Sequence, residues 1–143
     1  MRICFVTTGD IESLATIKRA SGMAEPLRRM GHGVAIVAWD TGNNRERFRA
    51  EAPQAEVLWV PPTLSGWAER YQKARLVKAW RPDLVYVCAY GVRNSFTRFG
   101  FRKGVRIVTE HSELASGIPR PFASRLKECF MEGLSIWASD SLL

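Results

Sequence analysis

The chain has 143 residues, a hydrophobic fraction of 46% and 21 Lys+Arg against 14 Asp+Glu, which gives a net charge of +7. A chain of this length suits one domain and buries about two-thirds of its unfolded surface, so neither disulfides nor a metal are needed to hold it together. The positive charge favours anionic partners without selecting among nucleotides, phosphorylated substrates, nucleic acid and acidic membranes. Residues 2–8 are too short for a signal peptide, and no apolar run approaches the roughly 20 residues that span a bilayer.

Six apolar runs are predicted strands, because nearly continuous runs rich in Val and Ile are typical of strands buried on both faces of a parallel sheet. In chain order they are Ile3–Thr7, Val34–Trp39, Val57–Val60, Leu84–Ala89, Val105–Thr109 and Ser141–Leu143. Cys4 and Cys88 lie in two of these runs and are interpreted as small buried hydrophobes. With Cys129 they form neither a disulfide pattern nor a zinc pattern, which fits a reducing cytoplasm.

A helix is predicted between the first two strands. Its apolar side consists of residues at helical spacing: Ile17, Ala20, Ala24 and Leu27. Gly31 stands where a left-handed residue ends a helix. Pro26 predicts a bend or a restart, because an interior proline removes a backbone hydrogen bond.

Residues 41–56 are polar, contain the turn sequence Gly42-Asn43-Asn44 and are predicted to be irregular. After Pro61-Pro62 comes an amphipathic stretch whose predicted apolar side is Trp67, Tyr71, Ala74, Val77 and Trp80, with Arg70, Lys73 and Lys78 lying off that side. We expect this apolar side to pack on the sheet. The alternative is that the tryptophans and the five basic residues from Trp67 to Arg81, Arg81 included, lie on an anionic membrane.

Further along, Asn94 or Ser95 is a candidate cap for a short helix that carries Phe96 and Phe99. Residues 116–121 are predicted to form a loop, and residues 121–137 a last helix. The chain stops inside the apolar run Ser141–Leu143, so we expect that it is a truncated piece of a longer protein.

This order of elements is a repeated β-α-β pattern, which predicts an α/β fold: a doubly wound, Rossmann-like, mostly parallel sheet flanked by helices, in the order 3-2-1-4-5-6. Ligands bind such sheets beyond the carboxyl ends of the strands. The loops after Thr8, Trp39, Ala89 and Thr109 are therefore the expected binding loops.

The loops after the first and second strands contain a glycine or an aspartate near the expected binding edge. Gly9 and Asp10 follow the first strand, where glycine lets a backbone approach a ligand. A dinucleotide fingerprint needs three glycines there, so NAD or FAD binding is disfavoured. Without them, Asp40 is interpreted as a loop residue and not as a ribose ligand. His32, at the opposite edge, is interpreted as structural.

Other polar residues of the expected edge are candidate acceptor contacts. Lys18 and Arg19 lie early in the first helix, and Tyr90, Arg93 and Asn94 follow the fourth strand. Arginine and amide groups suit sugar hydroxyls or phosphate, while simple solvation is the alternative. Charge is spread along the chain without a nucleic-acid module, so nucleic acid is not an expected partner.

Five segments, in this order, resemble the N-terminal domain of family 4-type GT-B glycosyltransferases. They are Arg2–Thr8 with Gly9, Leu27–Val37, Arg81–Val87, Val108–Ser112 and Trp137–Leu143. Together they cover nearly the whole chain. Two features depart from the family: the loop Thr8–Glu12 lacks the paired glycines of many members, and the paired-glutamate donor motif of the second domain is absent.

The resemblance implies that residues 1–143 are the acceptor-side Rossmann-like domain, without the donor-binding domain. The parent enzyme would move a sugar from a nucleotide-sugar donor to an acceptor hydroxyl with retention. No metal and no cofactor besides the donor are expected, and the implied location is the cytoplasm, with peripheral contact at the inner membrane face as an option. The fragment alone should be inactive.

The resemblance also assigns roles at the fifth strand. The histidine that matches His111 lies in the cleft near the transferred sugar and its phosphates, where it donates a hydrogen bond to developing negative charge. Its neighbours Glu110 and Ser112 belong to the same binding segment. We expect Glu110 to orient a loop or to pair with an arginine, since it alternates to the other face of the strand.

Two alternatives remain open. One is a nucleotide-sugar epimerase of the same architecture, suggested by Ile17-Lys18 and Glu25-Pro26-Leu27. The other is a non-catalytic α/β interaction module.

Overall fold

The computed structural model describes residues 1–7, 15–88, 104–110, 130 and 141–142. Its strands form a six-stranded parallel sheet in the order β3-β2-β1-β4-β5-β6. The strands are β1 (Arg2–Val6), β2 (Gly33–Trp39), β3 (Glu56–Val60), β4 (Leu84–Val87), β5 (Arg106–Thr109) and β6 (Ser141–Leu142). The predicted doubly wound, Rossmann-like fold and strand order are confirmed.

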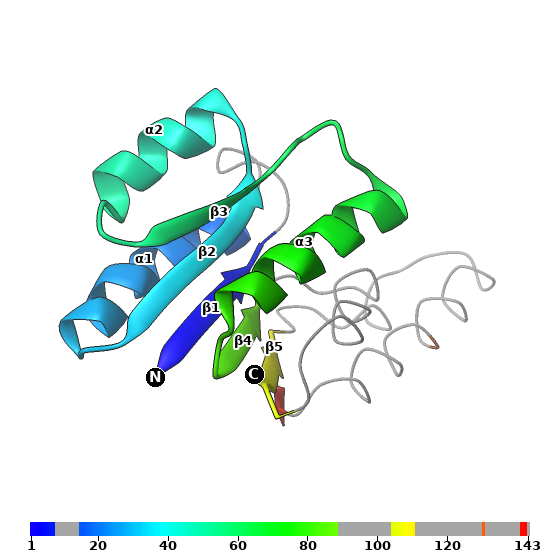
Figure 1. The fold of residues 1–143 in the computed structure, drawn as a ribbon. Helices are drawn as coiled ribbons and strands as arrows, with labels where there is room; N and C mark the ends of the chain where they lie inside the picture. The colour runs from blue at the N-terminus through cyan, green and yellow to red at the C-terminus, as the bar shows by residue number, and fades with distance from the viewer. Residues whose placement is uncertain (8–14, 89–103, 111–129, 131–140, 143) are drawn as a thin grey trace.

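β1 lies at the centre of the sheet, between β2 and β4 (Figure 1). Phe5 stands opposite Ile36 of β2 on one side and Tyr86 of β4 on the other. The strand order reverses direction between β1 and β4, so the topological switch point lies at the carboxyl ends of these two strands.

Helices cover both faces of the sheet: α1 (Ala15–Arg29) and α2 (Gly42–Glu51) lie on one face, and α3 (Gly66–Trp80) lies on the other (Figure 1). Successive residues of β1 alternate between the two layers. Phe5 packs with the α1 and α2 core, while Cys4 and Val6 pack with the core beneath α3. This alternation is why the strands are apolar on both faces.

α1 matches its prediction except at Pro26. Ile17, Ala20 and Ala24 are fully buried, and the helix continues through Pro26 to Arg29 without the predicted restart. Gly31 has φ +84°, and the N–H of His32 donates to the carbonyl oxygen of Leu27 at 3.1 Å. These features form the left-handed cap predicted from the glycine.

The prediction that residues 41–56 are irregular is wrong, because Gly42–Glu51 forms helix α2. The Oγ1 atom of Thr41 accepts a hydrogen bond from the backbone N–H of Asn44 at 3.2 Å and caps the helix. Only Asn44 and Phe48 within the helix are buried, so the sequence lacks an apolar stripe. The capping threonine was the one local indication of a helix.

The prediction for the apolar side of α3 is confirmed at Val77 and Trp80, which are 1% and 9% exposed, but it is wrong at the start of the helix. Trp67 and Tyr71 are 69% and 72% exposed, whereas Lys73 is 2% exposed. The helix has two stripes at helical spacing, and the sheet covers the one that contains Lys73, Val77 and Trp80. Both stripes contain Val77 and Trp80, and the aromatic residues Trp67 and Tyr71 favoured the wrong continuation toward the start of the helix.

The short helix expected near Asn94, the loop 116–121 and the last helix lie outside the described residues, apart from Phe130, which is helical. Of the helices that the structure describes, none has the length and apolar character to cross a membrane.

Candidate functional site

The carboxyl edge of the sheet gathers polar side chains from both helical layers. Thr7, Trp39 and Glu110 stand at the ends of β1, β2 and β5, and the first turns of α1 and α3 begin above this edge. Loops at such an edge, held by a rigid sheet, are where α/β proteins bind their ligands.

On the α1 side, Arg19 forms an ion pair with Glu110. The backbone N–H of Glu110 donates to the carbonyl oxygen of Val87 at 3.0 Å, which extends the ladder one residue past β5. The hydroxyl of Tyr86 lies 3.4 Å from Oε2 of Glu110. Glu110 thus has the arginine partner that we expected, and the pair ties α1 to the end of β5.

This pair sets the electrostatics of that side of the edge. The side chain of Glu110 is only 12% exposed, whereas that of Arg19 is 40% exposed. Burial and the nearby Cys88 raise the pKa of Tyr86, and Arg19 partly offsets that rise. A guanidinium has five N–H donors, so the exposed part of Arg19 is able to bind an anionic group such as a phosphate while the ion pair persists.

On the α3 side, a buried lysine holds the end of β1. The Nζ atom of Lys73 donates to the carbonyl oxygen of Thr7 at 2.8 Å and lies 2.7 Å from Oε1 of Glu69. The same Oε1 atom accepts a hydrogen bond from Nε1 of Trp39 at 3.0 Å. Three elements, β1, β2 and α3, are joined by these three contacts.

The pKa values reflect competition between burial and pairing. Burial lowers the pKa of Lys73, and the hydrogen bond that Lys73 donates to Glu69 opposes that effect. Burial raises the pKa of Glu69, but its hydrogen bonds with Lys73 and Trp39 outweigh burial, and the pKa falls below its usual value. Lys73 has almost no exposed surface that a ligand could contact. We therefore interpret the Lys73–Glu69 pair as a structural support for the edge of the sheet.

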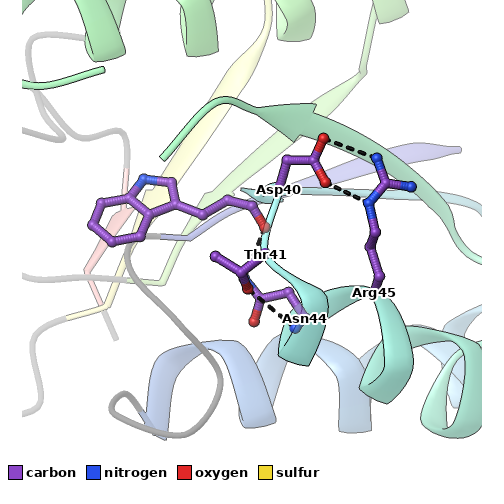
Figure 2. A network of polar contacts seen from close by, with 5 residues as sticks. Asp40, Thr41, Asn44 and Arg45 are labelled. Atoms are coloured by element: carbon purple, nitrogen blue, oxygen red, sulfur yellow. Dashed lines mark hydrogen bonds and ion pairs between the residues drawn. The ribbon is translucent and has the colours of Figure 1, made fainter. Parts of the chain in front are cut away.

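A third polar group follows β2 (Figure 2). Two guanidinium nitrogens of Arg45 donate to the two carboxylate oxygens of Asp40 at 2.5 and 2.8 Å. The hydrogen bond from Arg45 lowers the pKa of Asp40. Arg45 also lies over the ring of Trp59, 5.0 Å from its centroid. Both oxygens of Asp40 are therefore engaged by a local arginine, as its interpretation as a loop residue requires.

The adjoining cap is held by Asn44, whose Nδ2 donates to the carbonyl oxygen of Trp39 at 2.8 Å. The cap and the Asp40–Arg45 pair together fix the first turn of α2 against the end of β2 (Figure 2).

Of the predicted site residues, Lys18, Arg19 and Glu110 are described. Lys18 is exposed on α1, and only Arg19 and Glu110 are in contact with each other. The rest lie outside the described residues: Gly9, Asp10, Tyr90, Arg93, Asn94, His111 and Ser112. Their roles stay predictions.

Sequence reasoning missed the Lys73–Glu69–Trp39 group. The one local indication was the four-residue spacing of Glu69 and Lys73, which places them side by side on a helix. That spacing does not reveal that the pair faces the sheet.

Among the residues that the structure describes, no group of three or more His, Cys, Asp or Glu side chains is placed to hold a metal ion. Cys4 and Cys88 are buried free thiols, as predicted. Burial raises the pKa of Cys88 to about 12 and raises that of Cys4 further.

Comparison with known proteins identifies related sequences and folds. A family model described as "Glycosyl transferase 4-like domain" matches residues 16–141. No curated protein matches the chain in sequence. Among solved structures, MurG of Acinetobacter baumannii superposes with a TM-score of 0.61 at 11% identity, covering 99% of this chain and 40% of MurG.

A short-chain dehydrogenase/reductase of Serratia marcescens superposes with a TM-score of 0.55 at 17% identity, covering 96% of this chain and 63% of that chain. A double mutant of a Serratia marcescens short-chain dehydrogenase/reductase gives 0.56 at 17% identity, over 93% of this chain and 65% of its own. At these identities the likenesses show the Rossmann-like fold alone. The chain spans less than two-thirds of the length of each of these proteins.

Proposed function

The chain belongs to the glycosyl transferase 4-like domain family, and from that membership we propose that it is the acceptor-side half of an enzyme that transfers a sugar from a nucleotide-sugar donor to an acceptor hydroxyl. The observation that carries the proposal is the family match over residues 16–141. A second, donor-binding domain completes the enzyme in this proposal. The share of MurG covered, 40%, leaves room for one in a protein of that size.

The proposed reaction breaks the bond between the sugar's anomeric carbon and the donor phosphate. The nucleotide diphosphate leaves with the bonding electrons, an oxocarbenium-like transition state forms, and the acceptor oxygen makes the new bond while its proton passes to the departing phosphate. Negative charge grows on the departing phosphate, so preorganised hydrogen-bond donors lower the barrier. Retention of configuration is part of the proposal and rests on the family resemblance.

Among the chain's residues, His111 is the proposed hydrogen-bond donor to the sugar or its phosphate. It follows Glu110 directly in the chain, and Glu110 is anchored by Arg19 and by the backbone of Val87. The exposed guanidinium of Arg19 supplies further positive charge at the same edge. Lys18 and the residues of the neighbouring loops are the proposed acceptor contacts: Gly9, Asp10, Tyr90, Arg93, Asn94 and Ser112.

The donor and the acceptor are the two reactants of this chemistry, and the proposal includes neither a metal nor a further cofactor. It places the enzyme in the cytoplasm, where the buried free thiols Cys4 and Cys88 remain reduced.

The test uses the full-length enzyme and a panel of nucleotide sugars, with released nucleotide and glycosylated acceptor as the readouts. His111→Ala should lower turnover about 100- to 1,000-fold, the typical effect of removing one such donor, while the melting temperature barely changes. A structural histidine would give the reverse pattern. The 143-residue chain alone should release no nucleotide above a heat-inactivated control.

Two outcomes would contradict the proposal. Conversion of the donor sugar without any acceptor would indicate an epimerase. Near-normal turnover of His111→Ala would remove His111 from the chemistry and leave the family assignment intact.

A further inference from the structure

The outward side of α3 combines exposed aromatic rings with positive charge. Trp67 and Tyr71 lie one helical turn apart and are 69% and 72% exposed. The guanidinium of Arg70 lies 4.5 Å from the ring centroid of Trp67. Exposed aromatic side chains of this size are uncommon on a surface that faces only water, because each leaves a large apolar area in contact with solvent.

The remainder of this side is cationic. Arg75, Lys78 and Arg81 line a groove together with Tyr71, Ala74 and Ala79. These three cations form no ion pair with an acidic residue among those whose side chains are described. We call Trp67, Arg70, Tyr71, Arg75, Lys78 and Arg81 the basic aromatic face.

The only acid of α3 does not neutralise this face. Glu69 lies on the inner side of the helix, where its carboxylate binds Lys73 and Trp39. On the opposite layer of the protein, by contrast, Arg45 and Arg47 are paired with Asp40 and Glu51. This side of α3 thus carries three cations that have no acidic partner among the described side chains.

We propose that the basic aromatic face of α3 docks on an anionic lipid membrane. Cations near a membrane surface are attracted by acidic headgroups, and Trp and Tyr are the side chains preferred at the boundary between headgroups and acyl chains. A helix that presents both lies in the plane of the interface. Membrane attachment is independent of sugar transfer, so either proposal can fail without the other.

Nucleic acid is the competing polyanion. Base stacking on Trp67 requires the one ring face that Arg70 leaves open. Insertion of the ring edge into a lipid interface has no such requirement. Lipid therefore fits the observed arrangement better.

The test is co-sedimentation of the 143-residue chain with vesicles of phosphatidylcholine containing phosphatidylserine. The wild-type chain should bind these vesicles and dissociate from them at high salt. It should not co-sediment with vesicles of pure phosphatidylcholine. Arg75→Glu with Lys78→Glu should weaken binding at least about tenfold, since each cation near the surface contributes a roughly fivefold factor. The matched control is Arg47→Glu with Arg49→Glu on α2, which makes the same change in net charge and should leave binding near the wild-type level.

A second measurement separates insertion from simple charge attraction. Brominated lipids quench tryptophan fluorescence at the interface, and Trp67→Phe should lose most of that quenching while it still binds. Trp67→Ala with Tyr71→Ala should weaken binding about tenfold. Circular dichroism and urea midpoints confirm that each variant is folded.

Three results would overturn the proposal. The first is a failure of the wild-type chain to bind anionic vesicles. The second is a loss of binding in the α2 control as strong as that in the α3 variant, and the third is unchanged quenching in Trp67→Phe. Tight binding of duplex or single-stranded DNA that depends on Arg75 and Lys78 but outcompetes the vesicles would assign the face to nucleic acid instead.

Discussion

Lys73 donates a hydrogen bond from Nζ to the carbonyl oxygen of Thr7 at 2.8 Å, across 66 positions of the chain. This contact brings the middle of α3 to the residue that directly follows the central strand β1. The lysine is 2% exposed, and Glu69 at 2.7 Å balances its charge. The network therefore sets both the stability of the fold and the position of the edge.

Lys73→Met should be among the most destabilising single changes in the chain. It leaves the carboxylate of Glu69 and the carbonyl of Thr7 without their buried cation. Removing one partner of a buried pair costs about 3–5 kcal/mol in the free energy of unfolding, and the partial exposure of Glu69 favours the lower end. Urea denaturation measures the change.

Lys78→Met is the matched control for that variant, since Lys78 lies on the same helix but is exposed. It should change the free energy of unfolding by less than about 0.5 kcal/mol. The double variant Lys73→Met with Glu69→Leu should regain much of the loss, because no charge is then buried. Equal effects of the two lysine variants would contradict the assigned role.

Glu69 should make the protein sensitive to acid. Its pKa lies below the usual 4.5 in the folded state, so its contribution to stability is fully present above that value and is lost as the pH falls through the lowered pKa. Glu69→Gln should be less stable at neutral pH, because Lys73 loses its counter-charge, and its stability should fall less steeply below pH 4.5. Urea midpoints provide the measurement, over a range from about pH 3 to about pH 7 that includes the usual glutamate pKa.

Gln72→Ala, a neighbouring change without a titratable group, should keep the wild-type pH profile. If the urea midpoint of Glu69→Gln falls with decreasing pH as steeply as that of the wild type, other carboxylates dominate acid unfolding.

Arg19→Met should destabilise the protein by about 1 kcal/mol, since it deprives the largely buried carboxylate of Glu110 of its cation while solvent screens part of the pair. Arg29→Met on the same helix is the control. Arg29 pairs with Glu25, but its side chain is 78% exposed, so its loss should be within about 0.5 kcal/mol. Thermal unfolding of both variants tests this prediction. Equal shifts in their melting temperatures would contradict a structural role for the Arg19–Glu110 pair.

Cys4 and Cys88 should resist thiol reagents in the native state. Both are buried, and burial raises the pKa of each, to about 12 for Cys88, so very little thiolate is present at neutral pH. In a Cys129→Ser background, a chromogenic disulfide reagent should label neither thiol until denaturant is added. Rapid labelling of the folded protein would show that the layers over β1 and β4 open readily.

The strands and their order in the sheet were predictable from local patterns in the amino-acid sequence. The apolar runs of β1 and β2 are buried on both faces, and such burial requires a continuous apolar pattern that can be recognised in the sequence. Because the crossover connections between parallel strands are right-handed, only a few strand orders were then possible. The glycine at position 31 predicted the end of α1 for an equally local reason, the left-handed backbone that glycine adopts without strain.

Tertiary structure decided which side of α3 faces the sheet and where charge is buried. Two stripes of that helix have helical spacing, and only the position of the Thr7 carbonyl and of the Trp39 ring makes burial of Lys73 favourable. The partner of Glu110 was equally undetermined, since Arg19 lies 91 positions away in the sequence. Such contacts join residues that are distant along the chain, and their free energy depends on desolvation and geometry that exist only once the layers have packed.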